Sequence, residues 1–140
     1  MPRLTQDAAW ARLTSAPVAR LATVDEHGRP HLVPVTFAVR RGVLYTAVDH
    51  KPKRSRDLRR LANIRANPHV SVLADHYDDD WERLWWVRAD GHARVIEDDA
   101  QMAAPIALLR DRYAQYRDRP PEGPVIAVTI DAWSGWSASG

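Results

Sequence analysis

Alternating apolar and polar positions divide the first third of the chain into short strands. Residues 18–24 (VARLATV) alternate apolar with other side chains and end in the tight turn DEHG, a pattern typical of paired strands. Residues 30–39 form a longer predicted strand, and residues 43–48 form a third after the turn RRG. We expect Pro34 at a sheet edge or a bulge, because proline has no amide hydrogen for a strand ladder. This order predicts an antiparallel meander.

Further strands are predicted in the second half of the chain, at residues 70–74, 84–96 and 125–136. Gly91 lies inside the longest of them and marks a candidate β-bulge. The acidic connection at residues 75–82 carries carboxylates and a histidine, which are metal-ligand types, but its spacing matches no calcium loop. A solvated connection is therefore the preferred interpretation, and we assign no metal ligand.

Helices are expected to begin at Thr5, near Ser55, and at Asp98 or Asp99. Each of these residues is a favoured N-cap. The first helix should end by Ala16, because the residue before a proline resists helical geometry. The third should run to about Tyr116. Short strands in meander order with a few helices predict a mainly β (α+β) fold, a small β-barrel of about six antiparallel strands with flanking helices. No repeat divides the chain, so residues 1–140 are expected to form one domain.

Composition narrows the classes of protein that remain. The chain has 140 residues and no cysteine, which excludes disulfides, thiolate catalysis and cysteine-ligated metals. No apolar run approaches the roughly 20 residues that a membrane span requires. The N-terminus also lacks the apolar core of a signal peptide. We therefore expect a cytoplasmic protein with no membrane partner.

Positive charge is concentrated in residues 51–65, which carry seven basic side chains and one acid, a local charge of +6. The whole chain has a net charge of +2, so the remainder is mildly acidic. The segment follows a predicted strand and enters a helix near Ser55, whose first amide groups and positive dipole end favour a phosphate or carboxylate. A solvated basic helix face is the alternative. Nucleic-acid binding is not expected, because no recognition motif accompanies the charge.

The motifs ARLATVDEHGRPHLVPV, YTAVD with the basic loop KPKR, and NPHVSVLAD stand in this order ahead of a tryptophan-rich strand. Together they resemble the pyridoxamine-phosphate-oxidase-like family of flavin and deazaflavin binders, most closely its actinobacterial coenzyme F420-dependent oxidoreductases. The resemblance spans nearly the whole chain, and it depends on the order and spacing of pieces that are individually common. It implies a split β-barrel and a homodimer with two cofactor sites at the subunit interface. Six tryptophans are compatible with such an interface.

The resemblance also implies which residues hold the cofactor. Two strands would line its ring, the loop after them would bind its phosphate, and the basic helix would meet an acidic tail. Trp85 and Trp86 point to opposite faces of their strand, so we expect one in the core and the other either stacked on the cofactor or packed across the dimer. The implied residues are Val35, Thr36, Tyr45, Thr46 and Ala47 for the ring, Lys51, Pro52, Lys53 and Arg54 for the phosphate, Arg59 for the tail, and Trp85 for stacking.

The function implied is that of an oxidoreductase that uses coenzyme F420 to transfer a hydride to a small unsaturated or conjugated organic substrate. No catalytic side chain is assigned, because such a cofactor carries its own reactivity. The basic surplus at Arg56, Arg59 and Arg60 favours F420, whose oligoglutamate tail adds carboxylates that FMN lacks. An FMN-binding oxidase or flavin carrier of the same fold is one alternative. A non-catalytic module that binds haem or another tetrapyrrole is the other.

Overall fold

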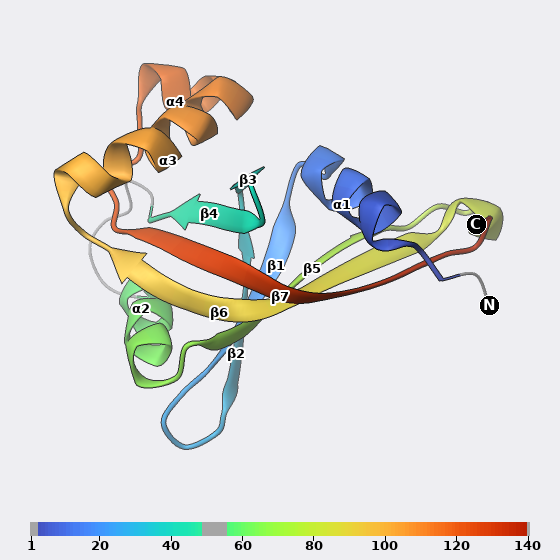
Figure 1. Cartoon of the computed structure of the whole chain (residues 1–140), viewed down its shortest axis with the longest axis horizontal. Coiled ribbons are helices and arrows are strands. Elements are labelled where there is room, and N and C mark those ends of the chain that lie inside the picture. Colours follow the sequence, from blue (N-terminus) through green and yellow to red (C-terminus); the bar gives the residue numbers. More distant parts are fainter. Residues whose placement is uncertain (1–2, 49–55, 140) are drawn as a thin grey trace.

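The computed structural model describes residues 3–48 and 56–139 of the chain (Figure 1). A single sheet with the strand order β2-β1-β5-β6-β7-β4-β3 dominates it, and every strand pair is antiparallel. The strands are β1 (Ala19–Val24), β2 (Pro30–Val35), β3 (Ala38–Arg40), β4 (Val43–Ala47), β5 (His69–His76), β6 (Trp85–Ile96) and β7 (Val125–Ser137). The helices are α1 (Gln6–Ser15), α2 (Arg56–Ala66), α3 (Asp99–Arg112), α4 (Ala114–Asp118) and a short 3-10 helix, η1 (Trp81–Arg83). The expected mainly β fold with flanking helices is confirmed.

The predicted meander of the first strands is wrong in one respect. The single strand expected at residues 30–39 breaks at Thr36 and Phe37 into β2 and β3, which lie at opposite edges of the sheet. Phe37 is fully buried, so the chain turns inward there and cannot continue the ladder with β1. β4 then pairs with β3 and with β7, a strand about 80 residues further along. The break raises the number of strands from the expected six to seven in the described part of the chain. Pro34 lies on the edge strand β2, as predicted.

The two long strands β6 and β7 run side by side across the molecule (Figure 1). Their register shifts between Asp90 and Gly91, so that Asp131 has no partner across the ladder. The β-bulge predicted at Gly91 is therefore confirmed. A Cβ atom at this position would overlap the backbone carbonyl oxygen of Thr129, so the close approach of the two backbones requires glycine.

The helix caps agree with the sequence where the structure describes them. The Thr5 hydroxyl accepts a hydrogen bond from the amide of Ala8 at 3.1 Å, and the Asp98 carboxylate accepts one from Gln101 at 3.0 Å. Ser55 lies outside the described residues. The third helix was expected to run to about Tyr116, but it is interrupted. Tyr113 adopts an extended backbone (φ −114°, ψ 118°) and separates α3 from α4.

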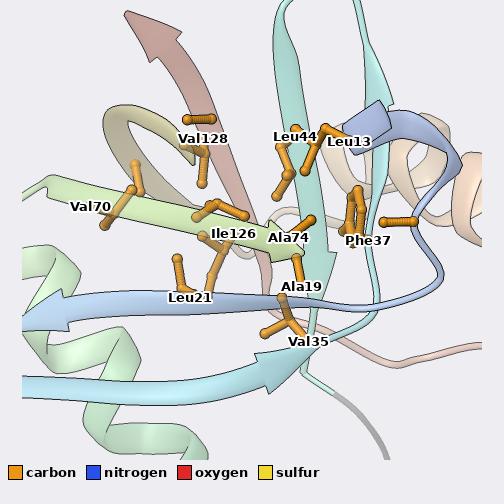
Figure 2. Packing of buried hydrophobic residues seen from close by; sticks show 14 of the residues in the cluster. Leu13, Ala19, Leu21, Val35, Phe37, Leu44, Val70, Ala74, Ile126 and Val128 are labelled. Atoms are coloured by element: carbon orange, nitrogen blue, oxygen red, sulfur yellow. The ribbon is translucent and has the colours of Figure 1, made fainter. Parts of the chain in front are cut away.

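Two apolar clusters form the core. In the larger one, side chains from α1 and the sheet point toward one another (Figure 2), and Leu61 and Ile64 of α2 belong to the same cluster. Leu13, Leu21 and Val72 are fully buried. In the smaller one, α3 and α4 cover the part of the sheet around β3, β4 and the beginning of β7, with Leu109 fully buried. Among the described residues, no helix is both long and apolar enough to cross a membrane.

Candidate functional site

A pocket of about 240 Å³ opens between the ends of β2 and β4. It is lined by Val18, Pro34, Val35, Thr36, Thr46, Ala47, Arg60 and Tyr116. Four of the residues implied by the sequence, Val35, Thr36, Thr46 and Ala47, therefore meet at one place. Its lining is mixed, with four apolar side chains beside three hydroxyl groups and one guanidinium.

The position of this pocket follows from the break between β2 and β3. Only Thr36 and Phe37 separate these two edge strands, and so short a link spans no more than about 10 Å. The two edges of the sheet must therefore approach each other, which curls the sheet into a half-barrel. The end of β2 then faces the end of β4, although the two strands are not hydrogen-bonded neighbours. The pocket occupies the gap that remains between the edges.

Side chains from α3 and its C-terminal end hold this wall of the pocket. The Tyr113 hydroxyl accepts a hydrogen bond from the amide of Phe37 at 3.1 Å and lies 2.9 Å from the carbonyl oxygen of Pro17. Arg112 donates to the carbonyl oxygen of Phe37 at 2.8 Å and to that of Ala16. Its guanidinium also lies 4.6 Å from the centre of the Phe37 ring. The segments that carry Val18 and Thr36 are thus tied to one helix end.

Tyr116 completes this side of the pocket from α4. Its hydroxyl and that of Thr36 lie 2.9 Å apart and form a hydrogen bond. The pair presents hydroxyl oxygens to the pocket next to the apolar surface of Val35 and Ala47. Hydroxyl groups both donate and accept, so this wall suits a flat ligand whose edge carries carbonyl and ring-nitrogen groups.

The other side of the pocket is positively charged. Helix α2 contributes Arg60 to the lining, and Asn63 anchors this helix by donating a hydrogen bond of 3.0 Å to the hydroxyl of Thr23, with both residues buried. Arg59 lies beside Arg60 on α2 and is exposed. Burial lowers the pKa of His31, and the positive charges of Arg59 and Arg60 lower it further. The α2 face therefore offers a positive field to an anion.

The structure places Tyr45 and Trp85 away from this pocket. Tyr45 packs against the smaller apolar cluster beneath α3. Ile96 marks the end of β6 near the pocket, because its β7 partner Val125 also pairs with Ala47. Trp85 lies at the other end of β6. The Trp85 ring stacks on His76, with ring centroids 6.4 Å apart. The phosphate residues expected from the sequence, Lys51, Pro52, Lys53 and Arg54, lie outside the described part of the chain.

The sequence left several lining residues unassigned. Arg60 was grouped with Arg56 and Arg59 as a basic surface for an acidic tail, and the structure places it in the lining of the pocket itself. Pro34 and Val18 adjoin assigned or strand residues. Tyr116 had no signal, because it reaches the pocket through the packing of α4 against a segment 80 residues earlier in the sequence. Among the described residues, no group of three or more histidines and carboxylates is arranged to hold a metal ion.

A second surface feature lies on the face of β2, β1, β5 and β6 that points away from the larger core. A hollow of about 530 Å³ there is lined by Leu32, Leu73, Trp86 and Ala22 together with Arg20, Ser71, Asp75 and Arg88. Leu32 is 66% exposed and Leu73 is 38% exposed. Arg20 pairs with Asp75 at 3.4 Å, and Arg88 pairs with Asp90 at 3.2 Å. We call this surface, defined by Leu32, Leu73, Trp86 and the two ion pairs, the outer face.

Comparisons with known proteins agree with this architecture. A family model described as pyridoxamine 5'-phosphate oxidase matches residues 5–137. No curated protein matches the chain. Among solved structures, a FAD-binding protein from Mesorhizobium loti has a TM-score of 0.71 at 23% identity and covers 96% of this chain and 95% of that one. A FAD-binding protein from Mycobacterium smegmatis has a TM-score of 0.67 at 21% identity, with 97% of each chain covered. HutZ, a haem storage protein from Vibrio cholerae, has a TM-score of 0.71 at 19% identity and covers 97% of this chain and 95% of that one. At such identities these likenesses establish the fold alone.

Proposed function

The chain belongs to the pyridoxamine 5'-phosphate oxidase family, and on that premise we propose that it is an oxidoreductase that binds the deazaflavin coenzyme F420. The proposed reaction reduces a small unsaturated or conjugated organic substrate. When bound, such a cofactor supplies the hydride itself. The protein's own residues then serve to bind it, orient it and exclude water from the transfer.

The observation that carries this proposal is the meeting of Val35, Thr36, Thr46 and Ala47 at one pocket with Arg60 at its border. The apolar side chains offer a flat surface to a ring system, and the hydroxyl groups can orient its polar edge. Arg60 can pair with an oxyanion of the cofactor. We propose that Lys51, Pro52, Lys53 and Arg54 hold the phosphate and that Arg59 meets the tail.

The choice among cofactors depends on charge. FMN carries one phosphate, whereas F420 adds a string of carboxylates that a basic helix can neutralise. The surplus of arginines on α2 therefore favours F420. The FAD-binding structural neighbours support the flavin alternative, an FMN-binding oxidase or carrier, and the haem storage protein supports a tetrapyrrole-binding module. These alternatives rank below F420, because each brings fewer negative charges to α2 than the F420 tail does.

Parallel fluorescence titrations with F420 and FMN test the proposal. We expect F420 to bind more tightly and to lose affinity as its glutamate tail is shortened.

Arg60→Ala should weaken the binding of both cofactors by about 1–3 kcal/mol, the cost of losing a charge-assisted contact. Arg59→Ala should weaken only the ligand with the acidic tail. Arg94→Ala, which removes an exposed arginine from β6, is the matched control and should change neither affinity. Tighter binding of FMN would overturn the assignment to F420, and tight binding of haem alone would favour the tetrapyrrole module.

We further propose that two copies of the chain associate through the outer face and that each cofactor site draws on both. Exposed leucines and Trp86 give this face an apolar centre. The ion pairs Arg20–Asp75 and Arg88–Asp90 flank it with equal numbers of opposite charges. A surface with both signs can face a copy of itself across a two-fold axis without net repulsion. The small volume of the pocket in one chain is consistent with closure by a second.

Sedimentation measures this association directly. We expect a dimer at micromolar concentration, and Leu73→Glu should shift it to monomer by placing a carboxylate in the apolar centre, at a cost of about 2–4 kcal/mol in association free energy. Ala103→Glu, an exposed position on α3, should leave the dimer intact. A wild-type monomer, or a Leu73→Glu dimer as stable as the wild type, would contradict the proposal.

A further inference from the structure

His31 of β2 has an unusual environment beneath helix α2. It pairs across the ladder with Thr23 of β1, and paired residues on neighbouring strands share one face of a sheet. Thr23 points to α2, since its hydroxyl accepts the hydrogen bond from Asn63. The imidazole of His31 therefore also points toward α2. Its Nδ1 atom is buried and has no hydrogen-bond partner among the described residues.

Such an atom needs an explanation, because buried polar atoms in folded proteins are almost always hydrogen-bonded. The charged groups that act on His31 from the described part of α2 are Arg59 and Arg60, and both are positive. The facing residue of β1 is Thr23, which cannot carry charge. A protonated His31 would thus become a third cation beside two others, and burial together with these charges lowers the pKa of the imidazole. Among the described residues, the imidazole thus combines an unpartnered Nδ1 with a lowered pKa, and a bound anion would favour its protonated form.

We propose that His31 is a third ligand of the anion that binds on the α2 face, taking up one proton from solvent as that anion arrives between it, Arg59 and Arg60. This inference rests on the proposed binding of an acidic cofactor. The oxyanion would be a tail carboxylate or, if Arg59→Ala also weakens FMN, a phosphate, and the two groups share the chemistry that the three side chains recognise. The protonated imidazole donates a hydrogen bond to that oxyanion, and no covalent bond changes. Anion binding and protonation of His31 then strengthen each other.

The sign of the pH dependence follows from this coupling. The proton is absent from His31 in the free protein near neutral pH and present in the complex, so affinity rises as pH falls through this range. One proton taken up per ligand gives at most about a tenfold gain in affinity per pH unit. A phosphate ligand itself loses negative charge near its second pKa of about 6, which opposes the gain. The comparison of interest is therefore between the wild type and a His31 variant with the same ligand.

The first experiment follows the imidazole of His31 by NMR through a pH titration of the wild-type protein, without ligand, with inorganic phosphate and with a glutamate trimer. We expect at least one of the two anions to raise the pKa of His31, and the one that does identifies the group recognised. An unchanged titration of His31 at concentrations where other α2 resonances shift would overturn the proposal. This measurement needs no variant and no intact cofactor, so a failure of F420 and FMN to bind would overturn the proposed function and leave this inference testable.

The second experiment measures proton uptake by calorimetry of F420 and FMN binding in two buffers with different ionisation enthalpies. The wild type should take up close to one proton more per ligand than His31→Gln at pH 7, and affinity should rise more steeply as pH falls. His27→Gln, a substitution in the exposed turn after β1, should behave like the wild type. Equal proton uptake by the wild type and His31→Gln would contradict the proposal even if both proteins bind F420 tightly.

Discussion

Replacing Gly91 with alanine is expected to lower the free energy of unfolding by about 3 kcal/mol or more, as overpacking against backbone does at its upper range. The new Cβ atom would overlap the carbonyl oxygen of Thr129 and contact a side-chain methyl of Val128. A flexible side chain could move aside, but a carbonyl oxygen in a strand ladder cannot move without breaking its hydrogen bonds. Many domains have a total stability of only about 5–15 kcal/mol, so the loss is a large fraction of it.

Urea denaturation of wild type and variants measures this effect. Gly28→Ala is the matched control, because Gly28 has a positive φ of 81° and no atom within 4 Å of an added Cβ. It should cost only about 1 kcal/mol, from backbone conformation alone. Equal losses for the two variants would mean that the β6–β7 bulge yields to the added methyl group. A Gly91→Ala protein that does not fold at all, alongside a folded Gly28→Ala protein, agrees with the expectation.

The bulge also connects stability to the candidate site. Val125 of β7 pairs with Ile96 on one side and with Ala47 on the other. The register of β6 against β7 therefore sets the position of β4 relative to β6, and β4 supplies Thr46 and Ala47 to the pocket. A shift of one residue would turn each side chain to the opposite face. Gly91 thus holds in register a ladder whose strand β7 pairs with β4, the strand that supplies one wall of the site.

Local features of the structure could be predicted from the sequence because their causes are local. Alternation located strands, Thr5 and Asp98 were recognisable caps, and glycine within a long strand indicated the bulge at Gly91. The inward turn at Phe37 was not predictable in the same way. Residues 30–39 read as one strand, and the break depends on side chains of α3 that lie about 75 residues later.

The candidate site shows the same division. The concentration of charge identified the helix that carries Arg59 and Arg60, since net charge can be summed from the sequence alone. Tyr116 and His31 could not be assigned, because their environments arise only when α4 packs against Thr36 and α2 packs over β1 and β2. Tyr45 was grouped with its neighbours Thr46 and Ala47, yet the alternation of a strand and the cover of α3 place it in the smaller apolar cluster.

Replacing Arg112 with alanine is the second substitution for which we expect a large effect. Its guanidinium donates to the carbonyl oxygens of Phe37 and Ala16 and lies over the fully buried Phe37 ring. Ala16 follows the C-terminal end of α1, and Phe37 lies in the break after β2. Neither carbonyl group belongs to a helix or a strand, so we expect no backbone amide to replace the arginine. The loss of these hydrogen bonds and of the ring contact should lower the free energy of unfolding by about 2–4 kcal/mol.

Arg112→Lys separates the geometry of the guanidinium from its charge. A lysine keeps the positive charge but cannot donate in two directions from a rigid planar group, so its stability should fall between those of the wild type and Arg112→Ala. Arg94→Ala removes an exposed arginine and should change stability by less than about 0.5 kcal/mol. Because Arg112 holds the segments that carry Val18 and Thr36 in one wall of the pocket, Arg112→Ala should also weaken cofactor binding although it does not line the pocket. If Arg112→Ala were as stable as Arg94→Ala in urea and bound cofactor with wild-type affinity, these hydrogen bonds would contribute neither to the fold nor to the site.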